Sequence, residues 1–183
     1  MGYAIARAAA TLGAETILVS GPTSLAPPAG VQLISVETTQ QMQDAVAKQF
    51  GSADMLVMAA APGDFTPSKV AAEKIKKQST KLNLTLEPTV DILLSIKNKR
   101  RPDQVVAGFA LETENGVTNA RKKLKGKGLD LIVLNNPRDE GAAFDYDTNR
   151  VTIITPRGKP ERWPLLNKDQ IAFKLLEKLY SML

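Results

Sequence analysis

The sequence contains no cysteine and no histidine among its 183 residues. Without cysteine, the chain has no disulfide, no thiol nucleophile and no thiolate zinc site. Without histidine, Ser-His-Asp triads and the usual zinc-hydrolase sites are excluded. Any catalytic acid, base or electrophile must therefore be Asp, Glu, Lys, Arg, Tyr or a backbone group. A bound metal would be a hard cation held by oxygen atoms, such as Mg²⁺ with phosphates.

Long hydrophobic runs are also missing. No apolar stretch approaches the roughly 20 residues that span a bilayer, and the longest one, residues 55–62, predicts a buried strand. Residues 1–13 lack the basic, apolar and small-residue order of a signal peptide. We therefore expect a cytoplasmic protein with no membrane partner.

Aromatic residues make up only 5% of the chain, whereas Lys and Arg (24) outnumber Asp and Glu (19). A net charge of +5 and a pI near 9.4 predict an anionic partner, which would be a nucleic acid, a nucleotide or a phosphorylated metabolite. No aromatic residues are interleaved with the basic ones, which disfavours a nucleic-acid stacking surface. The chain length, with 43% hydrophobic residues, predicts one folded domain.

Apolar patterning alternates between strands and helices along the chain. Helices are expected over 2–12, 39–50 (capped by Thr38 or Thr39), 92–96 (capped by Thr89), 115 or 118–127, and 168–182 (capped by Asn167 with Gln170). Strands are expected over 16–20, 31–36, 54–61, 82–86, 104–110 and 129–134, and a hairpin over 150–154 and 161–164. This order predicts an α/β fold, a doubly wound, mostly parallel Rossmann-like sheet with a C-terminal antiparallel hairpin.

Ligands of such sheets bind outside the carboxyl ends of the strands, which directs attention to residues 61–67, 110–116 and 134–142. Three alanines at 59–61 leave room for a ligand to approach the backbone, and Asp64 could hold a ribose hydroxyl or a metal-bound water. A tightly packed strand end with Asp64 as a cap is the alternative. Phe109 could stack on a base or belong to the core.

Lysines gather in two segments. Residues 73–77, within a stretch punctuated by Pro and Gly, predict either a flap that closes on phosphates or a solvated face. In the second segment, residues 121–127, Lys123 and Lys127 share one helix face. That pair fits a polyphosphate, a complement to the helix dipole or a general nucleic-acid patch.

Taken together, these segments resemble the bacterial phosphopantothenoylcysteine synthetase family, the carboxy-terminal half of a bifunctional decarboxylase/synthetase flavoprotein of coenzyme A biosynthesis. The matching segments follow the family order over nearly the whole chain, at residues 1–6, 19–22, 59–65, 73–77, 91–93, 108–113, 127–133 and 149–152. The chain departs from the family at Pro62-Gly63, where Val-Ala is usual. It departs again at Thr89-Val90, where Asn/Thr-Pro is usual.

The resemblance implies a reaction in which the carboxylate of 4′-phosphopantothenate attacks CTP, with Mg²⁺ accompanying the nucleotide. The acyl-CMP formed is then attacked by the amine of cysteine. It implies that Lys74 stabilises the transferring phosphoryl group and that Lys123 and Lys127 bind the triphosphate. The other implied nucleotide contacts are Ala60, Ala61, Asp64, Val90, Asp91, Ile92, Leu93 and Phe109. No metal ligand is assigned, and ATP is an alternative to CTP.

The resemblance also implies a homodimer, in which a hairpin near residues 149–154 packs across the two-fold axis, and an upstream decarboxylase domain. No flavin is expected in this chain. The family pattern begins earlier, with a strand and a Ser-Ser-Gly-Lys loop, so we expect one domain over residues 1–183 that lacks that strand. The alternatives are a nucleotide-binding fragment without catalysis, a nucleic-acid-binding protein and a dinucleotide oxidoreductase, the last disfavoured because no Gly-rich fingerprint occurs.

Overall fold

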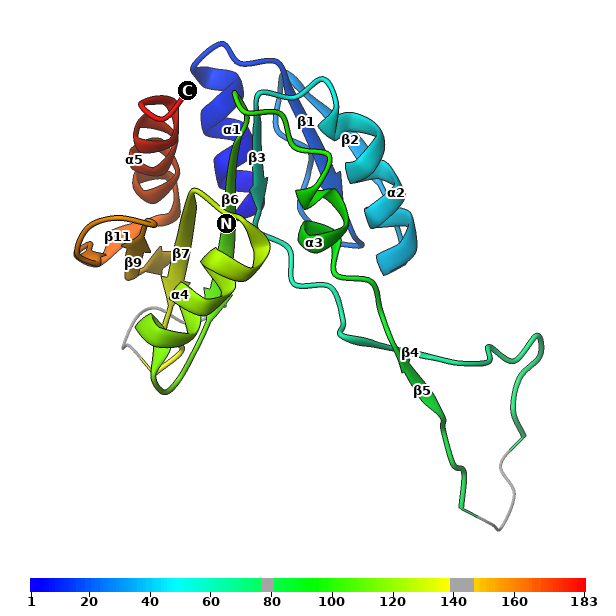
Figure 1. Cartoon of the computed structure of the whole chain (residues 1–183). Coiled ribbons are helices and arrows are strands. Elements are labelled where there is room, and N and C mark those ends of the chain that lie inside the picture. Colours follow the sequence, from blue (N-terminus) through cyan, green and yellow to red (C-terminus); the bar gives the residue numbers. More distant parts are fainter. Residues whose placement is uncertain (77–80, 139–146) are drawn as a thin grey trace.

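The computed structural model of the chain describes residues 1–76, 81–138 and 147–183 (Figure 1). The helices are α1 (Gly2–Thr11), α2 (Thr39–Phe50), α3 (Ile92–Lys97), α4 (Gly116–Lys127) and α5 (Lys168–Tyr180). The strands are β1 (Thr16–Ser20), β2 (Val31–Ser35), β3 (Met55–Met58), β4 (Phe65–Pro67), β5 (Leu86–Pro88), β6 (Val105–Leu111), β7 (Leu131–Asn135), β8 (Thr148–Asn149), β9 (Val151–Ile154), β10 (Glu161–Arg162) and β11 (Leu166–Asn167).

The central sheet has five strands in the order β10-β9-β7-β6-β3. Strands β3, β6 and β7 are parallel, whereas β9 runs antiparallel to β7 and forms the expected hairpin with β10. The predicted α/β class, with its parallel strands and C-terminal hairpin, is therefore confirmed. None of the helices in the described part of the chain is long and apolar enough to cross a bilayer.

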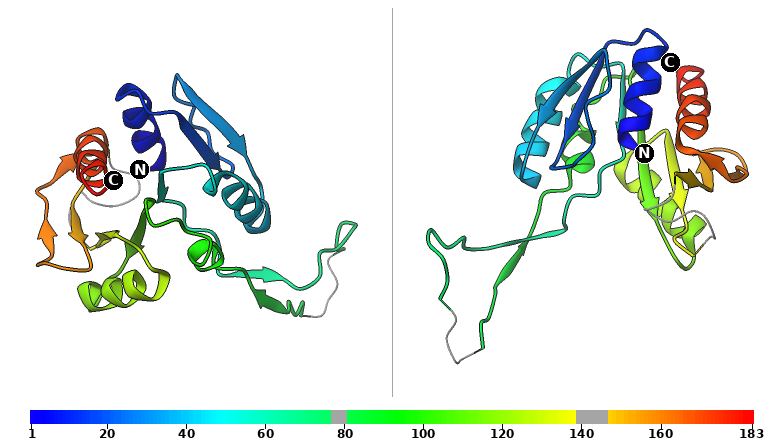
Figure 2. Two further views of the ribbon diagram at one scale, coloured as in Figure 1. Left: turned by 45° about the horizontal axis from the view of Figure 1, so that its top comes forward. Right: turned by 180° about the vertical axis from the view of Figure 1, so that it is seen from behind.

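Helices cover both faces of this sheet (Figure 2). On one face, α1 and α5 pack against alternate residues of β6, β7 and β9. On the other face, α2, α3 and α4 cover the intervening residues. Trp163 is 2% exposed in the first cluster; its Nε1 donates to Glu161 Oε1 at 2.7 Å, and Lys174 Nζ lies 4.5 Å from the ring centre.

The sheet is interrupted between β1 and β3. Strand β1 pairs in parallel with β2 alone, and within the described residues no hydrogen-bonded ladder joins β1 to β3. All residues of β1 and β3 are only half-buried, whereas most of β6 and β7 is fully buried. The same two helical layers nevertheless contact both strands, since α1 packs on β1 and residues of β3 join both apolar clusters.

A long arm leaves the body of the molecule after β3 and returns before α3 (Figure 2). Its described part contains the antiparallel pair β4 and β5, in which Thr66 pairs with Glu87. The strand expected over 82–86 is wrong, because only Leu86 is in a strand, and that strand continues to Pro88. An alternating pattern forms a half-buried strand only against a core, and residues 82–88 are exposed throughout.

The expected cap of α3 is also wrong. Asp91, not Thr89, is the N-cap, and its Oδ1 accepts a hydrogen bond from Leu94 N at 3.2 Å. The Thr89 side chain donates instead to Gly63 O at 2.6 Å, and Thr89 N donates to Asp64 O at 2.9 Å. Through these two hydrogen bonds, Thr89 holds the two ends of the arm together at its base.

Candidate functional site

A cavity of about 360 Å³ lies where β1, β2 and β3 end. Carboxyl ends of parallel strands are the usual place for ligands in α/β sheets. The cavity is lined by three loops, comprising residues 20–23 after β1, residues 36–39 with Met42 after β2, and residues 60–63 after β3. Ala60, Ala61 and Gly63 have little or no side chain, which leaves this wall open to close approach of a ligand.

The N-terminus of α2 forms another wall of this strand-end cavity. Thr38 caps the helix: its Oγ1 accepts from Gln41 N at 3.1 Å, and Gln41 Oε1 accepts from Thr38 N at 3.1 Å. A fixed helix N-terminus favours negative charge nearby. Glu37 lines the same wall, and a carboxylate is suited to accept hydrogen bonds from hydroxyl groups. The cavity thus suits a ligand with both an anionic part and a hydroxylated part.

The sequence-predicted residues after β3 lie at this cavity or beside it. Ala60 and Ala61 line it, and the exposed Asp64 follows directly after Gly63. Because Thr89 binds the backbone at Gly63 and Asp64, this edge of the cavity is tied to the base of the arm. The structure therefore brings these three predicted residues together.

The predicted residues of the α3 segment have structural partners. Val90 is 46% exposed, whereas the side chains of Ile92 and Leu93 are buried in the apolar cluster under α2 and α4. The side chains of these two residues are therefore not available to a ligand. Asp91 caps α3 and also pairs with Lys127 Nζ at 2.9 Å through its Oδ2.

Lys123 lies beside a carboxylate at the end of β6. Its Nζ is 2.6 Å from Glu112 Oε1, and Glu112 Oε2 accepts from Asn119 Nδ2 at 3.0 Å. These hydrogen bonds, chiefly the one from Lys123, hold the pKa of Glu112 below its ordinary value. Both lysines expected at the triphosphate, Lys123 and Lys127, are therefore paired with carboxylates in this structure.

Phe109 and Lys74 lie apart from these lysines. The Phe109 side chain packs on the sheet face covered by α1 and α5, whereas α4, with Lys123, covers the opposite face. Lys74 is exposed in the arm, which projects away from the body (Figures 1 and 2). The structure does not bring either residue together with the strand-end cavity.

Comparison with known proteins assigns the chain to a family. Residues 1–182 match the family model described as the DNA/pantothenate metabolism flavoprotein C-terminal domain. The chain belongs to this family.

Individual relatives agree with this assignment. The chain is 42% identical over 183 residues to the coenzyme A biosynthesis bifunctional protein CoaBC of Bacillus subtilis (strain 168), covering all of this chain and 45% of the relative. It is 39% identical, over all of this chain and 51% of the relative, to a cysteine/cysteine sulfinic acid decarboxylase from an unknown prokaryotic organism. The chain thus spans about half the length of the curated relatives it matches.

A solved structure supports the fold. The crystal structure of the C-terminal domain of CoaBC superimposes with a TM-score of 0.82 at 39% identity, covering 99% of this chain and 82% of that one. The sequence resemblance to this family is therefore confirmed across the whole chain.

Several residues at the strand-end cavity were not identified as site residues from the sequence. Glu37, Thr38 and Met42 line it from the β2–α2 connection, and Ser20 and Thr23 line it from the loop after β1. The capping pattern at Thr38 and Gln41 was a usable signal, since a capped helix start directly after a strand lies at the ligand edge. Glu112 lies in the predicted segment 108–113, but nothing in the sequence indicated its contact with Lys123.

No metal centre preformed by side chains was found within the described ranges, since no three Asp or Glu residues lie together there. Among the site residues expected from the sequence, Asp64 is the one whose carboxylate oxygens lie near the cavity and could bind a cation. A Mg²⁺ ion in this family member would therefore need further oxygen ligands, such as the phosphates of a nucleotide.

Proposed function

We propose that this chain is a phosphopantothenate–cysteine ligase domain of coenzyme A biosynthesis that uses CTP. The supporting observation is its full-length similarity to CoaBC proteins, together with the 39% identical CoaBC C-terminal domain structure. The cavity with an open backbone wall, a helix N-terminus and a carboxylate suits a nucleotide in such a reaction.

In the proposed reaction, a carboxylate oxygen of 4′-phosphopantothenate attacks the α-phosphorus of CTP and pyrophosphate leaves. The cysteine amine then attacks the acyl carbon, loses a proton and expels CMP, which leaves the amide. Mg²⁺ bound to the nucleotide would offset the charge of its phosphates.

Residues of this chain have distinct roles in the proposal. The backbone at Ala60 and Ala61 and the carboxylate of Asp64 contact the nucleotide. The backbone of residues 90–93 completes its binding site, whereas the Phe109 ring, which packs under α1 and α5, is given no contact with the nucleotide. Lys123 and Lys127 bind the triphosphate after exchanging their carboxylate partners for phosphate oxygens. Lys74 stabilises the charge that develops on the transferring phosphoryl group.

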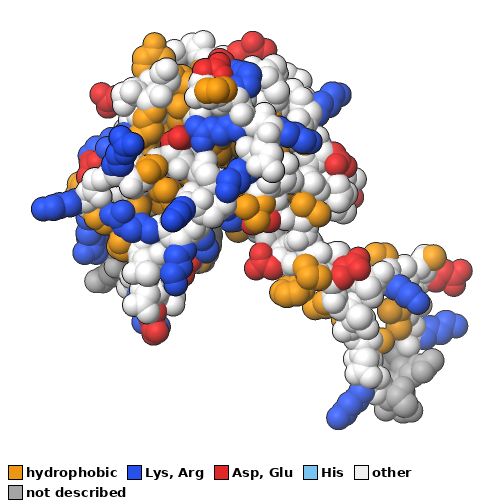
Figure 3. Space-filling view, viewed as in Figure 1, with side chains coloured by type: hydrophobic (Ala, Val, Ile, Leu, Met, Phe, Trp, Pro, Cys, Tyr) orange, Lys and Arg blue, Asp and Glu red, His pale blue; other side chains and the backbone are white. Residues whose placement is uncertain are grey.

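The position of Lys74 in the arm bears on the oligomeric state of the proposed enzyme. Lys74 lies in an arm whose apolar side chains are exposed, including Phe65 at 62%, Leu82 at 64% and Leu84 at 65% (Figure 3). Burying such side chains against another subunit would be favourable. We therefore propose a homodimer in which the arm packs on the second subunit. Strand β9, which the resemblance placed at the two-fold axis, is paired on both edges and has three buried side chains.

The break between β1 and β3 leaves one edge of each strand without a ladder among the described residues. In the proposal, a further parallel strand occupies the break and contributes to the site. Turnover by the 183-residue chain therefore tests two features at once, the reaction and the need for that strand.

Pyrophosphate release by this chain is the deciding measurement. The assay contains 4′-phosphopantothenate and Mg²⁺, with CTP or ATP in parallel, with and without cysteine. Release with CTP that requires 4′-phosphopantothenate establishes the ligase. No release, with thermal stabilisation by CTP, indicates the alternative of a nucleotide-binding fragment. If neither nucleotide gives pyrophosphate release or thermal stabilisation, the proposal is contradicted.

A further inference from the structure

Helix α4 has two pairs of basic residues four positions apart, and the two pairs differ in their partners. The helix contains five Lys or Arg residues and no acidic residue. Lys123 and Lys127 pair with Glu112 and Asp91. For Arg121 and Lys125, no carboxylate partner occurs among the residues that the structure describes. One side of α4 is thus charge-compensated and the other is not.

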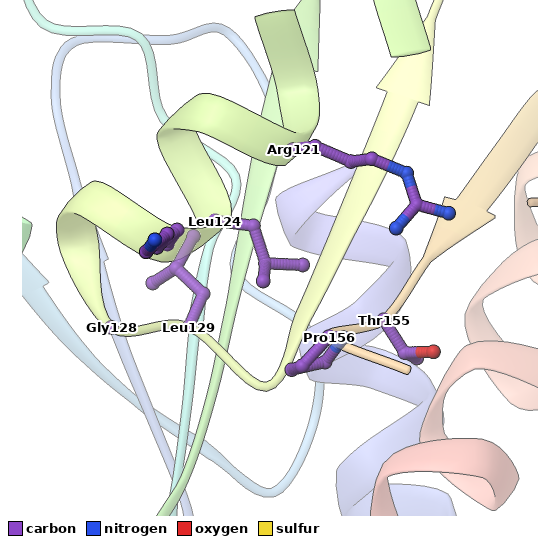
Figure 4. A pocket seen from close by; sticks show the side chains of 7 residues that line it. Arg121, Leu124, Gly128, Leu129, Thr155 and Pro156 are labelled. Carbon is purple, nitrogen blue, oxygen red and sulfur yellow. The ribbon is translucent and has the colours of Figure 1, made fainter. Parts of the chain in front are cut away.

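The uncompensated pair borders a cavity of about 380 Å³ (Figure 4). Arg121, Leu124 and Lys125 contribute from α4, Gly128 and Leu129 from the turn before β7, and Thr155 and Pro156 from the end of β9. The start of β7 and the end of β9 lie at the edge of the sheet opposite to the carboxyl ends of the parallel strands. This α4–β9 cavity is therefore separate from the strand-end cavity.

The α4–β9 cavity combines an apolar floor with a positive rim. Leu124 is 5% exposed and Leu129 4% exposed, and Pro156 adds a third apolar surface. The guanidinium of Arg121 is held by a hydrogen bond from its Nη2 to Gly158 O at 2.9 Å, which leaves other N–H groups available. Arg157 and Lys159 follow the lining residues Thr155 and Pro156 in the sequence, and no carboxylate occurs over residues 155–160.

We propose that the α4–β9 cavity binds a small molecule that has an apolar body and a terminal phosphate monoester. A phosphate monoester has a charge of about −1.5 to −2 at pH 7, which matches one guanidinium and one ammonium group. Arginine N–H groups fit phosphate oxygens in a fixed geometry. The apolar body then lies on Leu124, Leu129 and Pro156. This binding is independent of the reaction proposed at the strand-end cavity.

Phenyl phosphate is a suitable probe, because its ring and its phosphate represent the two parts of the proposed ligand. We expect titration of the full chain to shift the NMR signals of the Leu124 and Leu129 methyl groups and the Gly128 amide in a saturable way. Inorganic phosphate, which has no apolar body, and phenol, which has no charge, should each bind about tenfold more weakly or worse.

Variants of helix α4 distinguish binding at the α4–β9 cavity from nonspecific attraction to surface charge. Arg121→Gln combined with Lys125→Gln should weaken binding of phenyl phosphate about tenfold, since two charge-assisted contacts are lost. Lys122→Gln removes the same kind of charge from the same exposed helix but does not line the cavity, and should leave binding within about twofold of the original. Unchanged methyl signals in the unliganded variants show that each of them folds.

Three outcomes would overturn the proposal. These are equal losses in the Lys122 variant and the double variant, equal binding of phosphate and phenyl phosphate, and shifts confined to the strand-end cavity around Ala60 and Thr38. None of them depends on CTP or pyrophosphate release. Failure of this proposal is therefore distinct from failure of the proposed ligase.

Discussion

At the scale of single residues, the three lysines of the proposed site lie in two different environments. Lys123 and Lys127 lie beside carboxylates, whereas Lys74 is exposed in the arm. A carboxylate partner fixes an ammonium group in position, but a phosphate must displace that partner to be bound directly. An exposed lysine has no such competition, yet it must be brought to the substrate by movement or by assembly.

Lys74→Ala tests the proposed catalytic role. We expect pyrophosphate release to fall about 10²- to 10³-fold, because a cation aimed at developing charge is lost, while CTP affinity changes little. Lys69→Ala is the matched control, since Lys69 is also exposed in the arm, and it should stay close to the parent activity. Parallel losses in affinity and rate for Lys74→Ala would show that Lys74 only binds the nucleotide.

Glu112 gives a prediction about pH. Its pKa is lowered from the ordinary value of 4.5 by hydrogen bonds from Lys123 and Asn119. A carboxyl whose pKa is lower in the folded chain stabilises the fold above pH 4.5, and this stabilisation is lost as the pH falls through the folded pKa. We expect Glu112→Gln to reduce the free energy of unfolding by about 1 kcal/mol at pH 7.

Urea unfolding at neutral and acid pH measures this effect. The difference between Glu112→Gln and the parent should shrink as the pH is lowered below 4.5. Glu114→Gln is the control, since its carboxylate is 74% exposed and lies 3.5 Å from Arg138. A surface pair of that kind contributes little, so the same pH dependence in both variants would be evidence against the assigned role of Glu112.

At the scale of elements, the local signals of the sequence predicted most helices and strands. The predicted capping box Asn167–Gln170 forms and begins α5. Of the two caps left open for α2, Thr38 is the one that forms, and Gln41 completes a capping box with it. A flap around residues 73–77 was one of the two interpretations of this stretch, but the strand pair of the arm was not predicted, because pairing of residues 65–67 with 86–88 depends on a register that no local pattern encodes. Thr89 and Asp91 are both good N-caps, and a tertiary contact of Thr89 with Gly63 decides between them.

The candidate site was likewise predicted where local sequence signals apply and missed where tertiary contacts decide. Ala60 and Ala61, which were predicted as nucleotide contacts, line the cavity, since the end of an apolar strand is visible in the sequence. Residues 36–39 were missed, because their approach to residues 60–63 depends on how β2 is placed relative to β3.

The arm should be removable without loss of the body. Its ends meet where Thr89 N donates to Asp64 O at 2.9 Å. A short Gly-Asn link in place of residues 65–88 can therefore close the chain without strain. We expect the melting temperature to change by less than about 4 °C, corresponding to under 1 kcal/mol, and pyrophosphate release to be lost. A molten product would show that the arm is part of the fold; full activity would show that the arm is dispensable for the proposed reaction.

At the scale of the whole molecule, the sheet consists of two pieces held together by helices. Neighbouring strands normally protect each other's amides by a continuous ladder, and here that ladder stops at β1 on one side and β3 on the other. The half-buried side chains of both strands show that the packing is also thinner at this break.

Hydrogen exchange should reveal the break. In a parallel strand, successive amides point to opposite edges. In β3 we therefore expect alternate amides to exchange at least about tenfold faster than their neighbours, which bond to β6. Strand β6 has partners on both edges and serves as the internal control. Uniform protection along β3 would show that its second edge is also paired in solution.

The position of Trp163 has a consequence for spectroscopy. It is the only tryptophan in the sequence, and it is buried between the five-stranded sheet and α5. Tryptophan fluorescence will therefore report on that half of the molecule and not on β1, β2 or the strand-end cavity. The sequence has no cysteine, so a single Thr23→Cys substitution at the rim of that cavity would create the only thiol. A dye attached there would pair with Trp163 to give each half of the molecule its own optical signal.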